Sequence, residues 1–261
     1  MQPPPAALRA GLWVASRSLR AMGRGRYALA DGLGTAVYAA ARQGRRRCAL
    51  NHQRLDPSLS ASDARRRALR SYREFMRTSF DFTWEYAMSP QTLTDRHFHT
   101  TGVDKAFAAR DRHGGGIFAL AHFGSWDVAA ALALAREIPL VAVMRAIGTD
   151  LVTRIALWAR RHQDMEVLIT GNAARGLIDA LRRGRFAAII CDLPERGATV
   201  DVDFCGGRTH FSVAPAWLSR KTGAPIMPVD CFREHDGRYH MVIHDPLLAV
   251  PGESDADVMQ R

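Results

Sequence analysis

The chain has 261 residues, 47% of them hydrophobic, with a mean hydropathy of −0.16 and a formal net charge of +10. This length allows a sizeable buried core, and this composition excludes both a disordered protein and a membrane protein with several spanning helices. Four scattered cysteines without a Cys-x-x-Cys pair exclude a disulfide framework and a zinc knuckle, which predicts reduced thiols in the cytoplasm.

The basic excess lies entirely at the N-terminal end. Residues 1–77 contain 16 arginines and no lysine against four acidic residues, a balance of +12. Apolar residues such as Leu12, Trp13, Leu29 and Val37 recur between the arginines, mostly three or four positions apart, as in an amphipathic helix. We expect this segment to lie on an anionic membrane surface. A helix that packs on its own domain with a solvated arginine face is the alternative. No apolar run reaches the roughly 18 residues of a spanning helix.

A further helix is expected from about Asp63 to Met88, with an apolar face and an arginine face. We expect residues 1–90 to form a helical membrane-binding segment and residues 91–261 an α/β core, within one continuous domain. His97 and His99 follow the helix and raise the question of a metal ion, but no third ligand stands at helical or hairpin spacing from them. We therefore expect no metal site.

The stretch around His122 and Asp127 carries the predicted chemistry. An apolar run, Gly116–Ala121, gives way to a helical run, Val128–Leu134, so a strand, a sharp turn and a helix are expected. Such a junction holds side chains over the carboxyl edge of a sheet, where open α/β sheets bind ligands. An aspartate that accepts the proton of one imidazole nitrogen leaves the other nitrogen able to deprotonate a hydroxyl. A buried histidine followed by an ordinary helix-start acid has equal weight on spacing alone.

Beyond this stretch, short apolar runs alternate with helical ones. Strands are expected at residues 139–144, 166–170, 186–191, 225–231 and 239–244, and helices at 151–161, 173–183 and 214–221. The alternation predicts an α/β fold with a central mixed β-sheet flanked by helices.

Polar residues end several of these elements. Arg145 ends an expected strand, and Arg160 and Arg161 end the helix that follows. A guanidinium near a strand end suits a phosphate, or the oxyanion of a tetrahedral intermediate. A solvated helix terminus explains Arg161 equally well. Asp192 directly follows the buried-looking strand that ends at Cys191.

The HX4D spacing of His122 and Asp127, with Gly-Ser-Trp inside it and a glycine-rich lead-in, resembles the bacterial lipid A and phosphatidylinositol-mannoside acyltransferases of the lysophospholipid acyltransferase superfamily. A second likeness, over residues 197–228, is the order strand, Phe-x-Gly, loop, Pro-containing helix, Thr-Gly-Ala and Pro. The resemblance covers about residues 40–250.

This resemblance implies a glycerolipid-acyltransferase-like fold and transfer of a fatty acyl group from acyl-CoA or acyl carrier protein to a hydroxyl of a membrane glycolipid or lysolipid. His122 would be the general base and Asp127 its orienting acid. No cofactor is expected beyond the acyl donor. The expected location is the cytoplasmic face of the inner membrane, as a peripheral protein.

The resemblance also implies substrate contacts. The family has an arginine at the place of Arg145 and another for which Arg160 is the closest match by spacing. The lipid A branch usually reads Asp-x-Asp where this chain has Asp192 and Pro194, so the second carboxylate of that motif is missing here. Asp192 is expected to have a structural or sugar-contacting role.

Asp201 distinguishes the two branches. The phosphatidylinositol-mannoside branch has a glutamate at this place, close to the catalytic histidine, whereas the lipid A branch generally has an apolar residue. Asp201 therefore joins the expected catalytic set and favours a glycolipid other than lipid A. An outward-facing acid on an alternating strand is an equal alternative. Arg208, in the loop that follows, is grouped with the substrate-binding residues.

Other classes of function fit less well. A non-catalytic lipid-binding or lipid-transfer protein on the same fold shares every apolar feature but has no need for the His/Asp pair. A nucleic-acid-binding module needs aromatic residues among exposed arginines, and here they fall on the apolar helix face, so no nucleic-acid partner is expected. Ser125 lacks the glycines of a nucleophile elbow, and Cys191 lies in an apolar run that keeps a thiol protonated. The family usually continues beyond Arg261 into a helical tail, so we expect an end strand or an acceptor contact to be missing here.

Overall fold

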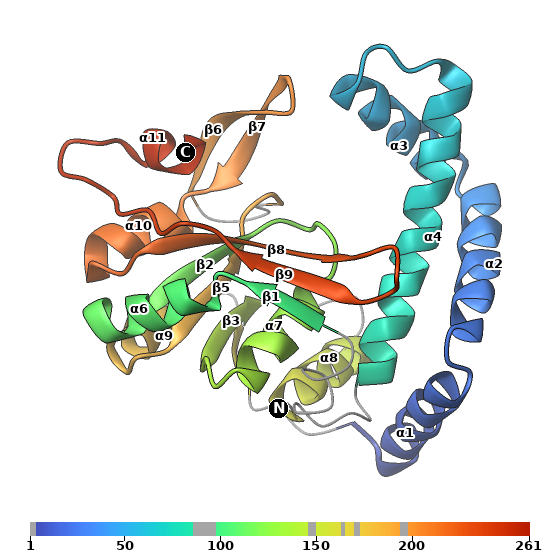
Figure 1. The fold of residues 1–261 in the computed structure, drawn as a ribbon, viewed down its shortest axis with the longest axis horizontal. Helices are drawn as coiled ribbons and strands as arrows, with labels where there is room; N and C mark the ends of the chain where they lie inside the picture. Colours follow the sequence, from blue (N-terminus) through green and yellow to red (C-terminus); the bar gives the residue numbers. More distant parts are fainter. Residues whose placement is uncertain (1–3, 86–97, 146–149, 163–164, 170–172, 194–197) are drawn as a thin grey trace. The chain divides into compact units, whose positions relative to one another are not determined.

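The computed structural model describes residues 4–85, 98–145, 150–162, 165–169, 173–193 and 198–261 (Figure 1). The chain divides into two compact units. The α/β unit contains residues 88–202 and 210–261 with the first six residues, and the helical unit contains residues 7–87 with 203–209. The boundary expected near residue 90 falls within residues 86–97, outside the described part of the chain.

Seven strands of the α/β unit form one sheet in the order β1-β9-β8-β2-β5-β3-β4. Their bounds are β1 Phe98–Thr101, β2 Gly116–Leu120, β3 Leu140–Met144, β4 Glu166–Ile169, β5 Phe186–Ile190, β8 Ile226–Arg233 and β9 Tyr239–Ile243. Strands β2, β3, β4, β5 and β8 run parallel, whereas β9 is antiparallel to β8 and parallel to β1. The sheet is therefore mixed, and the predicted fold class is confirmed.

Helices pack on both faces of this sheet. One face is covered by α6 (Val103–His113), α7 (Trp126–Ala135) and α8 (Asp150–His162), and the other by α9 (Ala173–Arg182), α10 (Ala214–Thr222) and α11 (Asp255–Gln260). Successive strand residues serve opposite faces: Ile117 and Phe118 of β2 belong to different core clusters, as do Phe186 and Ala187 of β5. This double burial explains why the strands read as continuous apolar runs.

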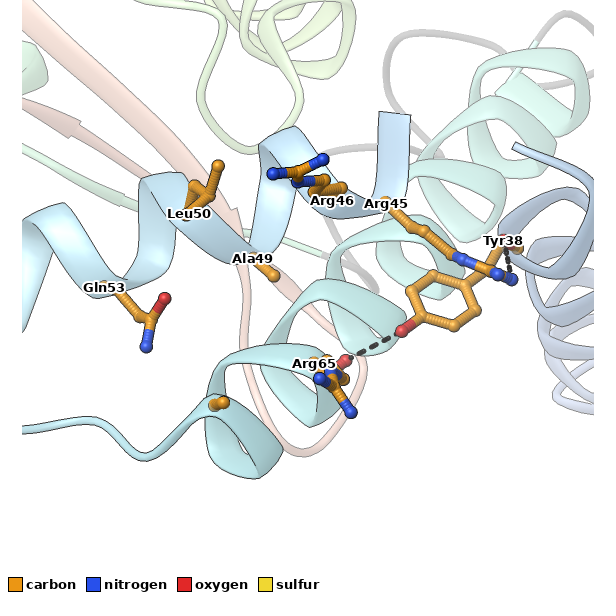
Figure 2. Close-up of a pocket in the computed structure, with 8 residues that line it drawn as sticks. Tyr38, Arg45, Arg46, Ala49, Leu50, Gln53 and Arg65 are labelled. Atoms are coloured by element: carbon orange, nitrogen blue, oxygen red, sulfur yellow. Dashed lines mark hydrogen bonds between the residues drawn. The ribbon is translucent and has the colours of Figure 1, made fainter. Parts of the chain in front are cut away.

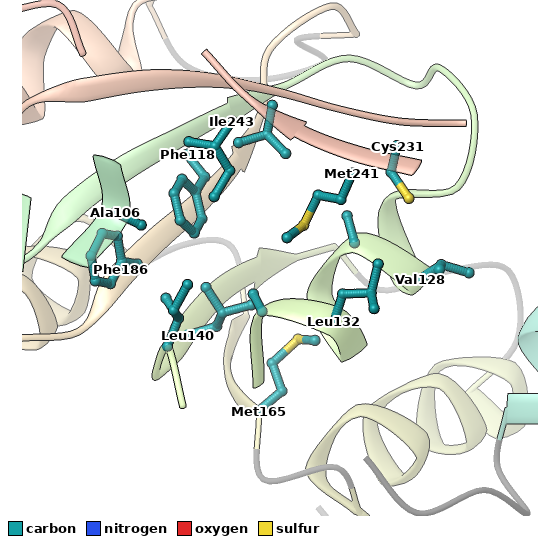
Figure 3. Close-up of a cluster of buried hydrophobic side chains, with 14 of the residues drawn as sticks. Ala106, Phe118, Val128, Leu132, Leu140, Met165, Phe186, Cys231, Met241 and Ile243 are labelled. Atoms are coloured by element: carbon teal, nitrogen blue, oxygen red, sulfur yellow. The ribbon is translucent and has the colours of Figure 1, made fainter. Parts of the chain in front are cut away.

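The core cluster beneath α6 and α7 combines large apolar side chains with several alanines (Figure 3). The rings of Phe118 and Phe186 stack with centroids 4.9 Å apart, across the paired strands β2 and β5. Leu132 of α7 and Met241 of β9 belong to the same cluster and are both fully buried. This packing fixes the central strands and the start of α7, which together hold the candidate site.

Three elements of the α/β unit, β1, α6 and α11, were not expected from the sequence. Strand β1 is short and pairs with β9, and α6 has polar residues on its outer side, so neither shows a strong apolar pattern. A separate two-stranded sheet is formed by β6 (Thr199–Phe204) and β7 (Gly207–Ser212). The second of these strands occupies a segment that was expected to be a loop.

The helical unit contains α1 (Ala6–Ala21), α2 (Gly25–Ala40), α3 (Arg42–Leu55) and α4 (Ala61–Glu85). Gly34 permits close packing of α2 on α4, because a Cβ at this position would lie 2.7 Å from the Cα of Arg73. The rings of Tyr38 and Tyr72 meet edge to face with centroids 5.5 Å apart. Packing of α2 and α3 along α4 is therefore specified by small residues and tyrosines.

Several arginines of the helical unit bind its own acids. Arg26 is buried and pairs with the fully buried Asp81 at 3.1 Å, and Tyr27 donates a hydrogen bond to the same carboxylate. Arg77 of α4 binds Asp31 of α2 through two hydrogen bonds of 2.5 and 2.6 Å. Part of the arginine pattern thus joins the helices to one another, as the packing alternative anticipated.

Large apolar side chains of α1 and α2 nevertheless remain exposed. They include Trp13, Val14, Leu29, Leu33 and Val37. None of the described helices is both long enough and apolar enough to cross a membrane.

Candidate active site

His122 stands two residues beyond β2, at the carboxyl edge of the sheet. The neighbouring strand β5 is parallel to β2, and its residues pair with β2 at a constant offset that brings Leu120 opposite Ile190. The segments that follow β2 and β5 continue in the same register, so Asp192 lies beside His122. In keeping with this register, the backbone N–H of Cys191 donates to the carbonyl of Leu120 at 2.8 Å. Register between the two central strands therefore places these side chains together.

Asp192 binds His122 through both carboxylate oxygens. The backbone N–H of His122 donates to Oδ2 at 2.9 Å, and Nδ1 of its ring lies 2.9 Å from Oδ1. Since an ionised carboxylate only accepts hydrogen bonds, Nδ1 carries the proton and Nε2 is the acceptor nitrogen. The ring of Trp126 packs edge-on against the imidazole with centroids 4.9 Å apart, which further fixes its orientation. The histidine remains reachable, with its side chain 37% exposed.

The turn after His122 depends on a glycine. Gly124 has φ 62°, and a Cβ there would lie 1.8 Å from the carbonyl oxygen of Cys231 in β8. The next residue, Ser125, donates its backbone N–H to that carbonyl at 2.8 Å. The turn is thus anchored on β8, while Asp192 anchors His122 on β5.

The predicted hydrogen bond between Asp127 and His122 is replaced by a different pairing. Among the described residues, Asp127 accepts hydrogen bonds from Arg160 of α8, at 3.0 Å from Nε and 2.8 Å from Nη2. Arg160 also contacts the sulfur of Met144 at the end of β3. The aspartate lies in the first turn of α7, where an arginine from α8 reaches it, whereas the strand-borne Asp192 already binds Nδ1 of the histidine.

Asp192 makes a contact that the sequence did not predict. It was expected to be structural or sugar-contacting, and the structure makes it the hydrogen-bond partner of His122. A signal was present: each residue stands six positions after the first residue of a buried apolar strand. Using that signal required knowing that β2 and β5 are neighbours, which the chain order alone does not fix.

The remaining expected site residues are dispersed over the α/β unit and the β6–β7 sheet. Arg145 lies exposed directly after β3. Asp201 of β6 pairs with His210 of β7, with Oδ1 2.5 Å from Nδ1, and both side chains are largely exposed. Arg208 lies exposed on β7. The structure brings His122 together with Asp192, and Asp127 with Arg160.

The two candidate nucleophiles are both unsuited to attack. Burial, with a smaller contribution from the nearby charge of Asp192, raises the pKa of the Cys191 thiol to about 12. Ser125 is only 1% exposed, and its Oγ is buried without a hydrogen-bond partner in the described part of the chain. A thiol that stays protonated and a hydroxyl without solvent access are both poor nucleophiles.

His99, on the edge strand β1, lies in a polar cluster with Glu234 and Asp236. Its Nε2 is 3.8 Å from Glu234, and with Asp236 these groups lie within 4.8 Å of one another. Arg238 donates to both oxygens of Asp236, and these hydrogen bonds lower the pKa of its carboxyl below the ordinary value. Ion pairing with Arg238 accounts for Asp236, whereas Nε2 of His99 is buried without a hydrogen-bond partner in the described part of the chain, so the expectation of no metal site stays a prediction. His97 lies outside the described residues.

Comparison with known proteins finds relatives that are all described as acyltransferases. Residues 9–261 match the family described as bacterial lipid A biosynthesis acyltransferase. A phosphatidylinositol mannoside acyltransferase of Mycolicibacterium smegmatis is 30% identical over 204 residues, which cover 77% of this chain and 66% of that protein. The protein of the same name from Mycobacterium tuberculosis H37Rv is 31% identical over 140 residues, covering 52% of this chain and 44% of that protein. The chain thus spans two thirds or less of the length of these relatives.

Proposed function

Because the chain belongs to the bacterial lipid A biosynthesis acyltransferase family, we propose that it transfers a fatty acyl group from a thioester, acyl-CoA or acyl carrier protein, to a hydroxyl of a membrane glycolipid or lysolipid. The observation that carries the proposal is the doubly hydrogen-bonded pair of His122 and Asp192 at the carboxyl edge of the sheet. A protein that only binds or transports lipid has no use for a histidine fixed in one tautomer and partly open to solvent.

In the proposed reaction, Nε2 of His122 takes the proton of the acceptor hydroxyl while the hydroxyl oxygen attacks the thioester carbonyl carbon. The tetrahedral intermediate then collapses with cleavage of the carbon–sulfur bond, and the imidazolium returns its proton to the departing thiolate. Asp192 stays ionised and keeps Nδ1 protonated throughout. It also stabilises the imidazolium that forms transiently, as an adjacent carboxylate does in other histidine-based sites.

The arginines of the site take different parts in this proposal. The charge of Arg160 is compensated by Asp127, with side chains only 16% and 18% exposed, so this pair positions α7 against α8. Arg145, exposed at the end of β3, is the cation we assign to the oxyanion or to a substrate phosphate. A backbone N–H of the turn after His122 is the alternative donor to the oxyanion.

For the acceptor, we propose a glycolipid of the phosphatidylinositol-mannoside type in preference to lipid A. The relatives that carry this name support the choice. Asp201 supports it as well, because the phosphatidylinositol-mannoside branch carries an acid at this position. Its contact with His210 suggests a second role for that carboxylate, in holding the β6–β7 sheet together.

We further propose that the helical unit binds an anionic membrane, on the cytoplasmic face of the inner membrane and without a spanning helix. Exposed Trp13 and Val14 lie in succession on α1, and the guanidinium of Arg17 lies 4.8 Å from the Trp13 ring centroid. An exposed aromatic ring with an arginine side chain over it suits the boundary between lipid headgroups and acyl chains. Such a location gives the enzyme access to a lipid acceptor and to a soluble acyl donor.

The test is transfer itself. The purified chain is incubated with palmitoyl-CoA or palmitoyl acyl carrier protein and a phosphatidylinositol-mannoside acceptor, and the lipids are analysed by mass spectrometry. The His122→Ala variant should lose about 10²–10⁴-fold or more in rate. His113→Ala, an exposed histidine at the end of α6, is the matched control and should retain the wild-type rate. Acyl transfer within about tenfold of wild type by His122→Ala would remove this residue from the mechanism.

A further inference from the structure

We propose that the helical unit holds a phosphate-binding pocket between α3 and α4, which takes the phosphate of a phospholipid headgroup. The pocket is lined by Tyr38, Arg45, Arg46, Leu50, Gln53 and Arg65, among others (Figure 2). The proposal rests on the membrane association proposed above and adds to it a discrete site. It lies apart from the catalytic histidine in the sequence, and it concerns binding only.

The size of the pocket suits a headgroup. Its volume is about 220 Å³. Pockets that enclose whole drug-sized ligands have roughly 300–1,000 Å³, so this one would take a phosphate with part of its alcohol and not an entire lipid. Leu50 lines the pocket and is 45% exposed, and it offers an apolar border where a glycerol backbone would begin.

The charge of the pocket has one sign. Three arginines line it and no acidic residue does. In the described part of the chain, no salt bridge involves Arg46 or Arg65, whereas Arg66, Arg67 and Arg77 of α4 each pair with an acid. A phosphate bound in this pocket would be attracted by the positive charges that line it. The planar forks of the guanidinium groups match phosphate oxygens by charge-assisted hydrogen bonds.

Hydrogen bonds and a ring contact hold three of the lining side chains in place, those of Tyr38, Arg45 and Gln53. Arg45 donates to the carbonyl of Ala39 at 2.9 Å, and its guanidinium lies 5.7 Å from the ring centroid of Tyr38. The Tyr38 hydroxyl donates to the carbonyl of Arg65 at 3.4 Å, and Gln53 donates to the carbonyl of Leu59 at 3.3 Å. Such preorganisation lowers the entropic cost of binding, while Arg46 and Arg65 keep exposed side chains.

We favour a lipid headgroup over free phosphate as the source of the phosphate that the pocket binds. Leu50 and Leu55 are exposed on α3, the helix that also supplies two of the arginines, so apolar and cationic side chains share one short helix. This combination suits the boundary between headgroups and acyl chains. A pocket for a fully soluble phosphate has no need of exposed leucines beside it.

The experiment compares two charge-matched variants of the full chain. Arg46→Gln/Arg65→Gln removes one pocket arginine from each helix, and Arg47→Gln/Arg70→Gln removes one exposed arginine from each helix outside the pocket lining. Binding is measured to phosphatidylcholine vesicles with and without phosphatidylglycerol. We expect the pocket variant to lose about tenfold more affinity for the anionic vesicles than the control, equivalent to ~1.4 kcal/mol. Equal losses of affinity in the two variants would overturn the proposed pocket and indicate that a diffuse basic surface binds the vesicles.

A second arm separates the two sources of phosphate. Glycerol phosphate at constant ionic strength should compete only weakly with vesicles, and vesicle binding should depend on the pocket arginines. Tight, variant-sensitive binding of glycerol phosphate, combined with vesicle binding that both variants retain, would overturn the lipid assignment. If the double variant has a lower melting temperature, Arg65→Gln is compared with Arg70→Gln, and equal losses again overturn the pocket. If wild type binds no anionic vesicles, the membrane proposal fails with it, whereas acyl transfer in detergent still tests His122 separately.

Discussion

His122 and Asp192 lie at the same level of two adjacent parallel strands, and two contacts of 2.9 Å join them, one to the backbone N–H and one to the ring Nδ1 of the histidine. Both residues therefore take their positions from β2 and β5, in the middle of the sheet. Strands hold side chains more precisely than loops do. Asp127, the acid suggested by sequence spacing, sits on a helix and binds Arg160.

Replacing each acid by its amide should separate the two roles. Asp192→Asn removes the charge beside His122, so we expect kcat to fall by about 10²–10⁴-fold with little change in KM. Asp127→Asn should reduce kcat less, because the carboxylate of Asp127 is paired with Arg160 and not with the histidine. The measurements are steady-state kinetics and melting temperatures of both variants. A large loss of kcat in Asp127→Asn at unchanged stability, with Asp192→Asn within about tenfold of wild type, would restore Asp127 as the orienting acid.

Much of the α/β unit could be predicted from the sequence, because a strand covered on both faces reads as a continuous apolar run. The position of His122 at a strand end followed from the same pattern. Its contact with Asp192 could not be predicted, since it depends on which strands are neighbours and in what register. Likewise, helical periodicity indicated an arginine face but not that Arg26 would be buried against Asp81, which comes from a helix far along the chain.

The ion pair of Asp127 and Arg160 should contribute to stability. Both side chains are largely buried, and two hydrogen bonds join them. We expect Arg160→Ala to lower the free energy of unfolding by about 1–3 kcal/mol, because the carboxylate is left partly buried without its partner. A double-mutant cycle with Asp127→Ala, followed by urea denaturation, should give a coupling energy of roughly 1 kcal/mol. Strictly additive losses would show that the pair does not couple.

Gly124→Ala should be severely destabilising. The added Cβ would meet the Cys231 carbonyl oxygen at 1.8 Å, at a backbone φ of 62°. We expect a loss of at least about 3 kcal/mol, measured by chemical denaturation. Gly114→Ala is the matched control, because its φ is 74° but nothing lies within 4 Å of the added Cβ. That variant should lose only about 1–2 kcal/mol, from backbone strain alone. Similar losses in both variants would contradict the contact with β8.

Membrane binding should depend on Trp13 and on salt. This side chain is 57% exposed on α1, beside Arg17. We expect Trp13→Ser to weaken binding to anionic vesicles by about tenfold or more, because a buried aromatic contributes ~1.5–3 kcal/mol. Raising the ionic strength should weaken wild-type binding as screening increases. Leu248→Ser, 43% exposed in the α/β unit, is the control. If both variants bind like wild type at every salt concentration, α1 is a packing element and not a membrane contact.

The order of chemical events follows from which groups of the site can react. A histidine base acts directly on the acceptor, so both substrates must be bound together, whereas a protein nucleophile forms an acyl-enzyme and gives ping-pong kinetics. The pKa of Cys191 is raised to about 12, so its thiol is protonated at neutral pH, and the hydroxyl of Ser125 is buried. We therefore expect intersecting double-reciprocal plots when donor and acceptor are varied.

Intact-protein mass spectrometry checks the same prediction independently. Incubation with acyl-CoA alone should leave the mass of the protein unchanged, although slow hydrolysis of the donor is allowed because water can replace the acceptor at His122. The reaction should also survive Ser125→Ala and Cys191→Ala, because neither side chain enters the proposed mechanism. A stoichiometric acyl adduct that persists after denaturation and maps to either residue would replace direct transfer by a covalent mechanism, with His122 then activating that nucleophile.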